Sequence, residues 1–232
     1  MLELTSDKAP LKTPMFTANH PVVFGDLSSG NLHKVQLILS MVGQSFNRVQ
    51  LSQLAGHTQD SRFTKLNPFG KYPLVLLEDG TLLRESAAIL FYFGKSTPLW
   101  PDSTLAQTRV LQWMFFEQYT HEPCLAVYRY KKCFLKSDNH GELASLRDAC
   151  EKVLQNLDRE IKSSDFITGS KVTLADIALY PYTYAISDTD LNLADYPALN
   201  AWSHRVESLE NFVPLGRDAA HQTLSFNDYF KE

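Results

Sequence analysis

The first part of the chain alternates between two spacings of hydrophobic residues, one typical of β-strands and the other typical of helices. Residues 22–27 (VVFGDL) form a short apolar run and residues 46–51 (FNRVQL) alternate, so each range predicts a strand. Between them, residues 31–43 carry apolar side chains at intervals of three and four and end at a glycine, which predicts a helix. The expected order is therefore strand, helix, strand.

A short helix, a hairpin and a longer helix are expected next. The short helix covers residues 59–66, and the runs YPLVLLE and TLLR follow it, joined by Asp79-Gly80, a dipeptide that favours a tight hairpin turn. From Glu85, ESAAILFYFGK predicts an amphipathic helix. This order of elements is that of an α+β thioredoxin-like domain, which we assign to residues 21–95.

The remainder of the chain is predicted to be helical. Residues 96–104 contain two prolines and little periodicity, so we interpret them as a linker. Residues 142–162 place apolar side chains along a single helical stripe, and Thr173-Leu-Ala-Asp176 has the pattern of a capping box. We therefore predict an all-α helical bundle domain over residues 105–232, and an N-terminal extension over residues 1–20.

Composition excludes several classes of protein. Hydrophobic residues make up 44% of the chain and charged residues 21%, as in ordinary soluble proteins. The net charge of −4 does not favour nucleic acid or an anionic membrane as a partner, and no apolar run could span a bilayer. The first residues do not have the pattern of a signal peptide. Cys124, Cys133 and Cys150 form no CxxC pair, so we expect no metal site and a reducing, cytoplasmic compartment.

Three motifs connect the chain with a known family. They are NPFGKYPLV at 67–75, DGTLLRESAAIL at 79–90 and VTLADIALYPY at 172–182. With these motifs in order, the chain resembles the cytosolic glutathione S-transferases over about residues 22–217. The stretch SGNLHKVQLIL from Ser29 resembles a bacterial subgroup distantly related to the theta and zeta classes. The resemblance implies a cytoplasmic, homodimeric detoxification enzyme that joins glutathione to small hydrophobic electrophiles, whose identity the sequence does not specify.

The resemblance also implies a binding site for the two ends of glutathione. Ser86, at a predicted helix start, would hold the glutamyl carboxylate, and Glu85 would hold the adjacent ammonium, although the two residues could instead serve only the helix end. Lys71 would pair with the glycyl carboxylate. His57 and Thr58, in the loop after the second strand, are weaker candidates for that carboxylate.

The middle of glutathione would be bound by backbone groups. An X-Pro peptide loses most of its preference for the trans form, so a cis bond at Tyr72-Pro73 is accessible. In the family this bond turns the backbone of the residue before proline toward the cysteinyl part of the ligand. Tyr72 stands here where many members carry valine or isoleucine. The alternative is a trans proline in an edge strand.

The thiol of glutathione must be ionised to act as a nucleophile. A thiol with a pKa near 8.5 is only about 3% thiolate at pH 7, and one hydrogen bond from a well-placed donor is sufficient to lower that pKa by about two units. The start of the first helix offers Ser28, Ser29 and Asn31. The resemblance matches Ser29 to the activating serine of the serine-type classes. Asn31 or a backbone amide are the alternatives, in which case the serines only cap the helix.

The electrophile would bind against an aromatic stretch of the helical part. Residues 111–134 are rich in aromatic side chains, some of which must pack in a core. We expect Tyr119, Tyr128 and Phe116 to line this pocket. The two tyrosines are favoured because a phenol tolerates a wet cleft.

Two other functions remain possible on the same fold. One is a glutathione-dependent peroxidase, dehalogenase or isomerase, and the other is a non-catalytic adaptor or regulatory protein. An adaptor has no need of Lys71, Tyr72-Pro73, Glu85-Ser86 and a polar first-helix start together. The chain contains all of them.

Overall fold

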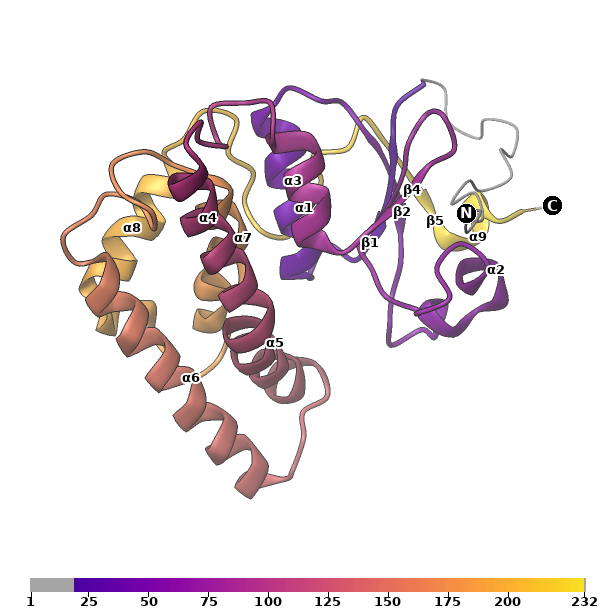
Figure 1. The fold of residues 1–232 in the computed structure, drawn as a ribbon. Coiled ribbons are helices and arrows are strands. Elements are labelled where there is room, and N and C mark those ends of the chain that lie inside the picture. The colour runs from indigo at the N-terminus through magenta and orange to yellow at the C-terminus, as the bar shows by residue number, and fades with distance from the viewer. Residues whose placement is uncertain (1–18, 232) are drawn as a thin grey trace, which may run out of the picture. The chain divides into compact units, whose positions relative to one another are not determined.

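The computed structural model describes residues 19–231, which form two compact units (Figure 1). The first unit contains the chain up to Phe93 together with the residues from Gly216 onward, and the second unit is Gly94–Leu215. Each unit has its own core, and each is described separately below. The expected extension over residues 1–20 lies almost entirely outside the described residues.

The first unit is built around a mixed sheet with the strand order β4-β3-β1-β2-β5. β1 pairs in parallel with β2, whereas β3 is antiparallel to both β1 and β4. This arrangement confirms the thioredoxin-like domain. The elements are β1 (Val22–Gly25), α1 (Gly30–Met41), β2 (Asn47–Gln50), the 3₁₀ turn η1 (His57–Gln59), α2 (Ser61–Thr64), β3 (Leu74–Leu76), β4 (Leu82–Arg84), α3 (Ser86–Gly94), β5 (Gln222–Ser225) and α9 (Phe226–Tyr229).

The core of the first unit explains why its strands are short apolar runs rather than alternating ones. β1 is buried along its whole length, as expected for a strand with neighbours in the sheet and cover on both faces. α1 is buried from Leu32 to Leu39, including positions that a half-exposed helix would turn to solvent. Burying each large apolar side chain contributes roughly 1.5–3 kcal/mol, so the buried residues of β1 and α1 contribute substantially to the stability of the first unit.

The C-terminal end of the chain differs from the sequence prediction. We expected residues 105–232 to be one helical domain, but residues from Gly216 onward belong to the first unit. There β5 adds a fifth strand, parallel to β2, beside which it lies in Figure 1. Phe226 and Phe230 then enter the same core as Phe24. Local periodicity could not predict this, because the strand is specified by the open edge of β2, more than 170 residues earlier in the chain.

The second unit is helical, as predicted. Its bounds are α4 (Thr104–Phe116), a π-type turn (Glu117–His121), α5 (Glu122–Arg129), a second π-type turn (Tyr130–Phe134), α6 (His140–Ile161), α7 (Leu174–Ala185), η4 (Ile186–Asp188), η5 (Leu193–Asp195) and α8 (Pro197–Glu207). α7 is buried on almost every side, while α6 shows one buried stripe and a charged outer face. The predicted linker, 96–104, forms turns that end where α4 begins.

The start of α7 is a highly connected polar point of the second unit. The Thr173 side chain accepts from the helix backbone, and Asp176 accepts from the Thr173 N–H at 2.8 Å, so the predicted capping box is present. Asp176 also accepts from the indole N–H of Trp202 at 2.8 Å and from the N–H of Ile167 at 2.8 Å. One buried carboxylate therefore joins α7, α8 and the loop before α7.

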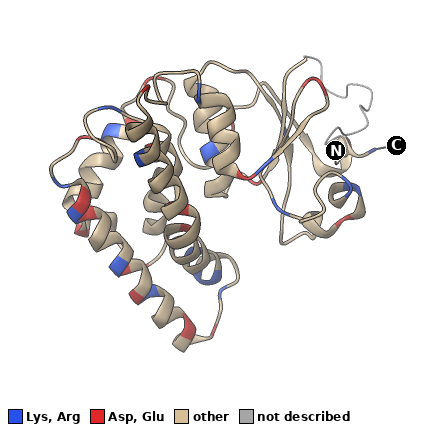
Figure 2. Ribbon diagram, viewed as in Figure 1, with Lys and Arg blue, Asp and Glu red and all other residues tan. Residues whose placement is uncertain are grey.

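Acidic and basic residues alternate over much of the part of the chain that the structure describes. In Figure 2, acidic and basic residues follow one another along α6 rather than gathering by sign. Within residues 19–231, no helix is both long and apolar enough to cross a membrane. The same residues contain no group of three or more His, Cys, Asp or Glu side chains arranged to hold a metal ion.

Candidate functional site

The start of α1 holds the three candidates for the thiol partner in different ways. Ser29 is the N-cap, and its Oγ accepts from the N–H of Leu32 at 3.3 Å. A hydroxyl that accepts still has its own proton to donate, so capping does not exclude a second contact. Ser28, by contrast, donates its hydroxyl to Asp26 at 2.7 Å. Of the two serines, Ser29 is thus better placed to donate to a ligand.

Asn31 links the start of α1 to the start of α3. Its Oδ1 accepts from the hydroxyl of Ser86 at 3.1 Å and from Nζ of Lys34 at 2.8 Å. Lys34 is 0% exposed, which is rare for a lysine and requires a polar partner. Because the carboxamide oxygen of Asn31 faces Ser86 and Lys34, its NH₂ group points away from these two donors. Lys34 is not among the residues predicted from the sequence, although a lysine three residues after Asn31 in an apolar helix is a visible signal.

The start of α3 combines a buried serine with an unusual backbone. Ser86, the first residue of the helix, is 4% exposed, whereas Glu85 before it is exposed. Glu85 has a φ of 64°, a left-handed conformation that costs of order 1–3 kcal/mol in a residue other than glycine. Its carbonyl accepts from the N–H of Ile89 at 2.9 Å. The backbone thus turns sharply at Glu85, directly before the first amides of α3.

The loop before β3 contains the other backbone-binding candidates. The Tyr72-Pro73 peptide is cis, as expected. Lys71 is exposed, and its carbonyl accepts from Nδ2 of the buried Asn67 at 2.6 Å. Asn67 is not among the residues predicted from the sequence, although it is the first residue of the NPFG motif.

Thr58 lies beside this same loop. Gly70 has a φ of +59°, and a Cβ at Gly70 would lie 2.7 Å from the carbonyl oxygen of Thr58. Only glycine permits this close approach and this conformation. The structure therefore brings Thr58 next to the residue that precedes Lys71.

His57 has contacts within the protein at the same loop. Its Nδ1 accepts from the N–H of Ser52 at 3.1 Å. Its ring is stacked on Phe226 with the centroids 4.2 Å apart and the planes at 9°. These contacts give His57 a role in holding the loop, which the sequence analysis did not consider because Phe226 is distant in the chain.

The three aromatic candidates of the second unit occupy different environments. Tyr119 is 89% exposed, and Phe116 is half-buried against Trp113. Tyr128 is 1% exposed and donates its hydroxyl to Asp190 at 2.5 Å. The expectation that Tyr128 lies in a wet cleft therefore needs correction, because its ring is inside the helical unit and its phenol is bonded to the protein.

Asp190 should make the second unit sensitive to acid. Its partial burial opposes ionisation, but hydrogen bonds from Lys132 and Tyr128 outweigh that effect and lower its pKa from 3.8 to about 2. A lowered folded-state pKa stabilises the fold above about pH 4, and this stabilisation is lost as the pH falls through about 2.

We therefore expect Asp190→Asn to reduce the free energy of unfolding at pH 7 by less than about 1 kcal/mol, since the carboxylate is half-exposed and screened by solvent. The difference between parent and variant should shrink as the pH falls from 4 to 2. Urea unfolding followed by circular dichroism measures both quantities. A difference that stays constant down to pH 2 would show that the carboxylate's charge is not responsible.

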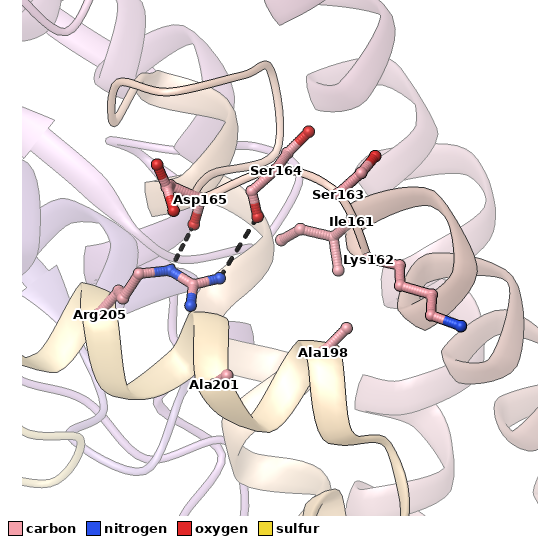
Figure 3. Close-up of a pocket in the computed structure, with 8 residues that line it drawn as sticks. All are labelled: Ile161, Lys162, Ser163, Ser164, Asp165, Ala198, Ala201 and Arg205. Atoms are coloured by element: carbon pink, nitrogen blue, oxygen red, sulfur yellow. Dashed lines mark hydrogen bonds between the residues drawn. The ribbon is translucent and has the colours of Figure 1, made fainter.

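The second unit contains a pocket of about 360 Å³ whose lining differs from the polar helix starts of the first unit (Figure 3). It lies between the end of α6 and α8. The guanidinium of Arg205 donates to the carbonyl oxygens of Asp165 at 2.7 Å and Ser164 at 3.4 Å. Arg205, one of two cationic residues that line the pocket, is thus used to close the loop after α6, and we assign the pocket no catalytic role.

Known families match both units. The sequence-family model described as "Glutathione S-transferase, N-terminal domain" matches residues 21–95. The family model described as "Glutathione S-transferase, C-terminal domain" matches residues 118–210. A solved glutathione S-transferase from Pseudomonas fluorescens Pf-5 is 36% identical, with a TM-score of 0.81 over 84% of this chain and 98% of that one. The chain belongs to the glutathione S-transferase family.

Relatives of this glutathione S-transferase family member carry two kinds of name. Glutathione S-transferase 2 of Anopheles gambiae is 29% identical over 173 residues, 72% of this chain and 81% of the relative. Protein URE2 of Debaryomyces hansenii is 23% identical over 248 aligned positions, 87% of this chain and 80% of the relative. The second name states no enzymatic activity. An activity can therefore be assigned only from family membership together with the chemistry of the site.

Proposed function

We propose that this protein is a glutathione transferase, which binds glutathione, holds its sulfur as a thiolate and directs it at small hydrophobic electrophiles. When bound, glutathione supplies the nucleophile: a C–S bond forms, and the electrophile's leaving group departs with its bonding electrons. In keeping with the family, we expect a cytoplasmic homodimer that acts in detoxification and needs no metal.

The observation that carries the proposal is the 3.1 Å hydrogen bond between Ser86 and Asn31. It joins the first turns of α1 and α3, so the N-termini of these two helices lie close together. Each N-terminus favours an anion by roughly 0.3–1 kcal/mol. Glutathione would bring a glutamyl carboxylate and a thiolate to these two helix starts.

The remaining candidates fit the other groups of glutathione. Glu85, exposed at the sharp turn before α3, is suited to the glutamyl ammonium. The backbone of Tyr72 is suited to the cysteinyl peptide. Lys71 and Thr58, which Gly70 brings together, are suited to the glycyl carboxylate. Together with Ser86 for the glutamyl carboxylate, these assignments give each charged end group of the tripeptide a polar or charged partner.

The thiolate requires only modest stabilisation. Lowering the thiol pKa by two units corresponds to about 2.7 kcal/mol, and one hydrogen bond to a charged acceptor contributes about 1.5–3 kcal/mol. The Ser29 hydroxyl is our first candidate for that donor, and the NH₂ of Asn31 is the second. The amino group of Lys34, 2.8 Å from Asn31 Oδ1, adds a cationic donor beside the second of these candidates.

Replacing Ser29 with alanine should therefore raise the thiol pKa of bound glutathione by about one unit, with little change in affinity. Thiolate absorbance in the ultraviolet, followed against pH, measures that pKa. Ser103→Ala is a matched control, because Ser103 also caps a helix by accepting from the third following N–H at 3.3 Å but lies in the second unit. If Ser29→Ala titrates like the parent, the donor is Asn31 or a backbone amide.

Calorimetric titration with glutathione tests the proposal as a whole. Binding, together with turnover of a chloronitroaromatic electrophile that releases chloride, would support the transferase. Binding with turnover only of an organic hydroperoxide or a haloalkane would instead assign the peroxidase or dehalogenase alternative. Absence of binding at millimolar glutathione, with no rise in melting temperature, would favour the adaptor.

A further inference from the structure

The C-terminal segment, residues 216–231, is attached to the first unit by an ion pair between the buried Arg48 and the partly exposed Asp218. Asp218 accepts from Nε of Arg48 at 3.1 Å and from a terminal nitrogen of the same guanidinium at 2.7 Å. It also accepts from the hydroxyl of Thr223 at 2.7 Å. Arg48 is buried and donates further to the carbonyl of Gly25 at 3.1 Å. These bonds attach the segment to β2 and to the end of β1.

Side-chain and strand contacts continue the attachment. The carboxamide of Gln36, on α1, donates to the carbonyl of Arg217 at 3.3 Å and accepts from the N–H of Ala219 at 3.0 Å. The N–H of His221 then donates to the carbonyl of Phe46 at 2.8 Å, immediately before β5 pairs with β2. The path of the segment is thereby specified up to Ser225.

Beyond β5, the segment packs against the loop that carries Thr58. Phe226 is buried and stacks on the ring of His57, with the centroids 4.2 Å apart. The guanidinium of Arg62 lies 4.7 Å from the centre of the Phe226 ring and donates to Oδ1 of Asn227 at 3.3 Å. Both sides of the loop, at η1 and at α2, therefore contact α9.

This loop, residues 52–71, has little regular structure of its own. Its helical pieces η1 and α2 have three and four residues, far fewer than the roughly 12–15 needed for a helix that is marginally stable alone. Residues 53–56 are exposed. Tertiary contacts must therefore determine its conformation, and the stack between His57 and Phe226 is such a contact at the residue next to Thr58.

We propose that the C-terminal segment positions this loop for the glycyl carboxylate of glutathione, so that Phe226 and His57 act as positioning residues for Thr58 and Lys71. The inference rests on the proposed function above. Displacing the loop should therefore weaken the binding of some ligands and leave that of others unchanged. Affinity falls in proportion to the fraction of molecules in the competent loop conformation, and only a ligand that uses the loop is affected. γ-Glutamylcysteine, which lacks the glycine, is such a loop-independent ligand.

The test compares the two ligands by calorimetry on the full-length chain. In the parent, glutathione should bind more tightly than γ-glutamylcysteine. In Phe226→Ala, we expect the Kd of glutathione to rise about tenfold and that of γ-glutamylcysteine to change less than twofold. Phe226→Tyr, which keeps the stacked ring, should restore the parent's ratio of the two affinities.

His57→Ala provides a second route, since it removes the stack from the loop side without opening a cavity under Phe226. It should give the same selective loss, whereas His57→Phe, which keeps a stacked ring but has no group that donates to a carboxylate, should bind both ligands as the parent does. Together the two variants decide the matter should Phe226→Ala fail to fold. Equal losses for the two ligands, no loss for either, or no preference for glutathione in the parent would each overturn the inference. If the parent binds neither ligand, the proposed function itself fails, which is a different outcome from all of these.

Discussion

Replacing Asp176 with alanine should lower the free energy of unfolding by about 3–5 kcal/mol, the largest effect that we expect from a single substitution in this chain. The carboxylate is fully buried and accepts from Thr173, Ile167 and Trp202. Its removal leaves three N–H donors without their acceptor in a site that water does not reach. Each such donor costs about 1–3 kcal/mol.

Urea unfolding monitored by circular dichroism would measure this effect. Asp148→Ala is the matched control, because Asp148 is exposed on α6 and its loss should change the free energy of unfolding by less than about 0.5 kcal/mol. Asp176→Asn keeps the size and one acceptor oxygen, so it should fall between the two. An Asp176→Ala variant as stable as the control would mean that the second unit does not depend on this connection.

The second large effect concerns ligand binding. Ser86→Ala should weaken glutathione binding by about tenfold to one-hundred-fold, because a hydrogen bond to a charged group contributes about 1.5–3 kcal/mol. The Ser86 hydroxyl donates to Asn31 at 3.1 Å in this structure, and rotation about its side chain would let it donate to the glutamyl carboxylate instead. The first amides of α3 would remain, so binding should be weakened rather than abolished.

Calorimetry with glutathione would measure this change, and Ser203→Ala serves as control. Ser203 is as buried as Ser86 and also lies in a helix, but it belongs to the second unit and contacts Glu207. Its replacement should leave the glutathione affinity of the protein unaltered. If Ser86→Ala also binds glutathione with unchanged affinity, the glutamyl carboxylate does not bind to Ser86 at the start of α3.

Local features of the site were predictable because short-range physical chemistry specifies them. A serine before an apolar helix caps it, and Ser29 does so. Thr173 and Asp176 stand three residues apart and form the capping box that this spacing predicts. The Asp-Gly dipeptide after Glu78 predicts a hairpin, and β3 and β4 form it. In each case the interacting groups are near neighbours in the chain.

The burial of a side chain was harder to predict from the sequence than the helix or strand that carries it. The helical period around Tyr128 indicates a helix, yet only the packed structure shows that its phenol is buried against Asp190. Lys34 has the composition of a surface residue and is fully buried beside Asn31. A single side chain does not determine its own burial, because burial depends on which elements cover it.

The sequence by itself determined the thioredoxin-like and helical parts, the cap of α1, the capping box of α7 and, through its motifs, the family. Only the tertiary structure decided that residues from Gly216 onward return to the first sheet, that Ser86 meets Asn31 and that His57 stacks on Phe226. The physical reason is sequence separation. Periodicity and capping act over three or four residues, whereas these contacts join residues 55 to about 170 positions apart, which only the folded chain brings together.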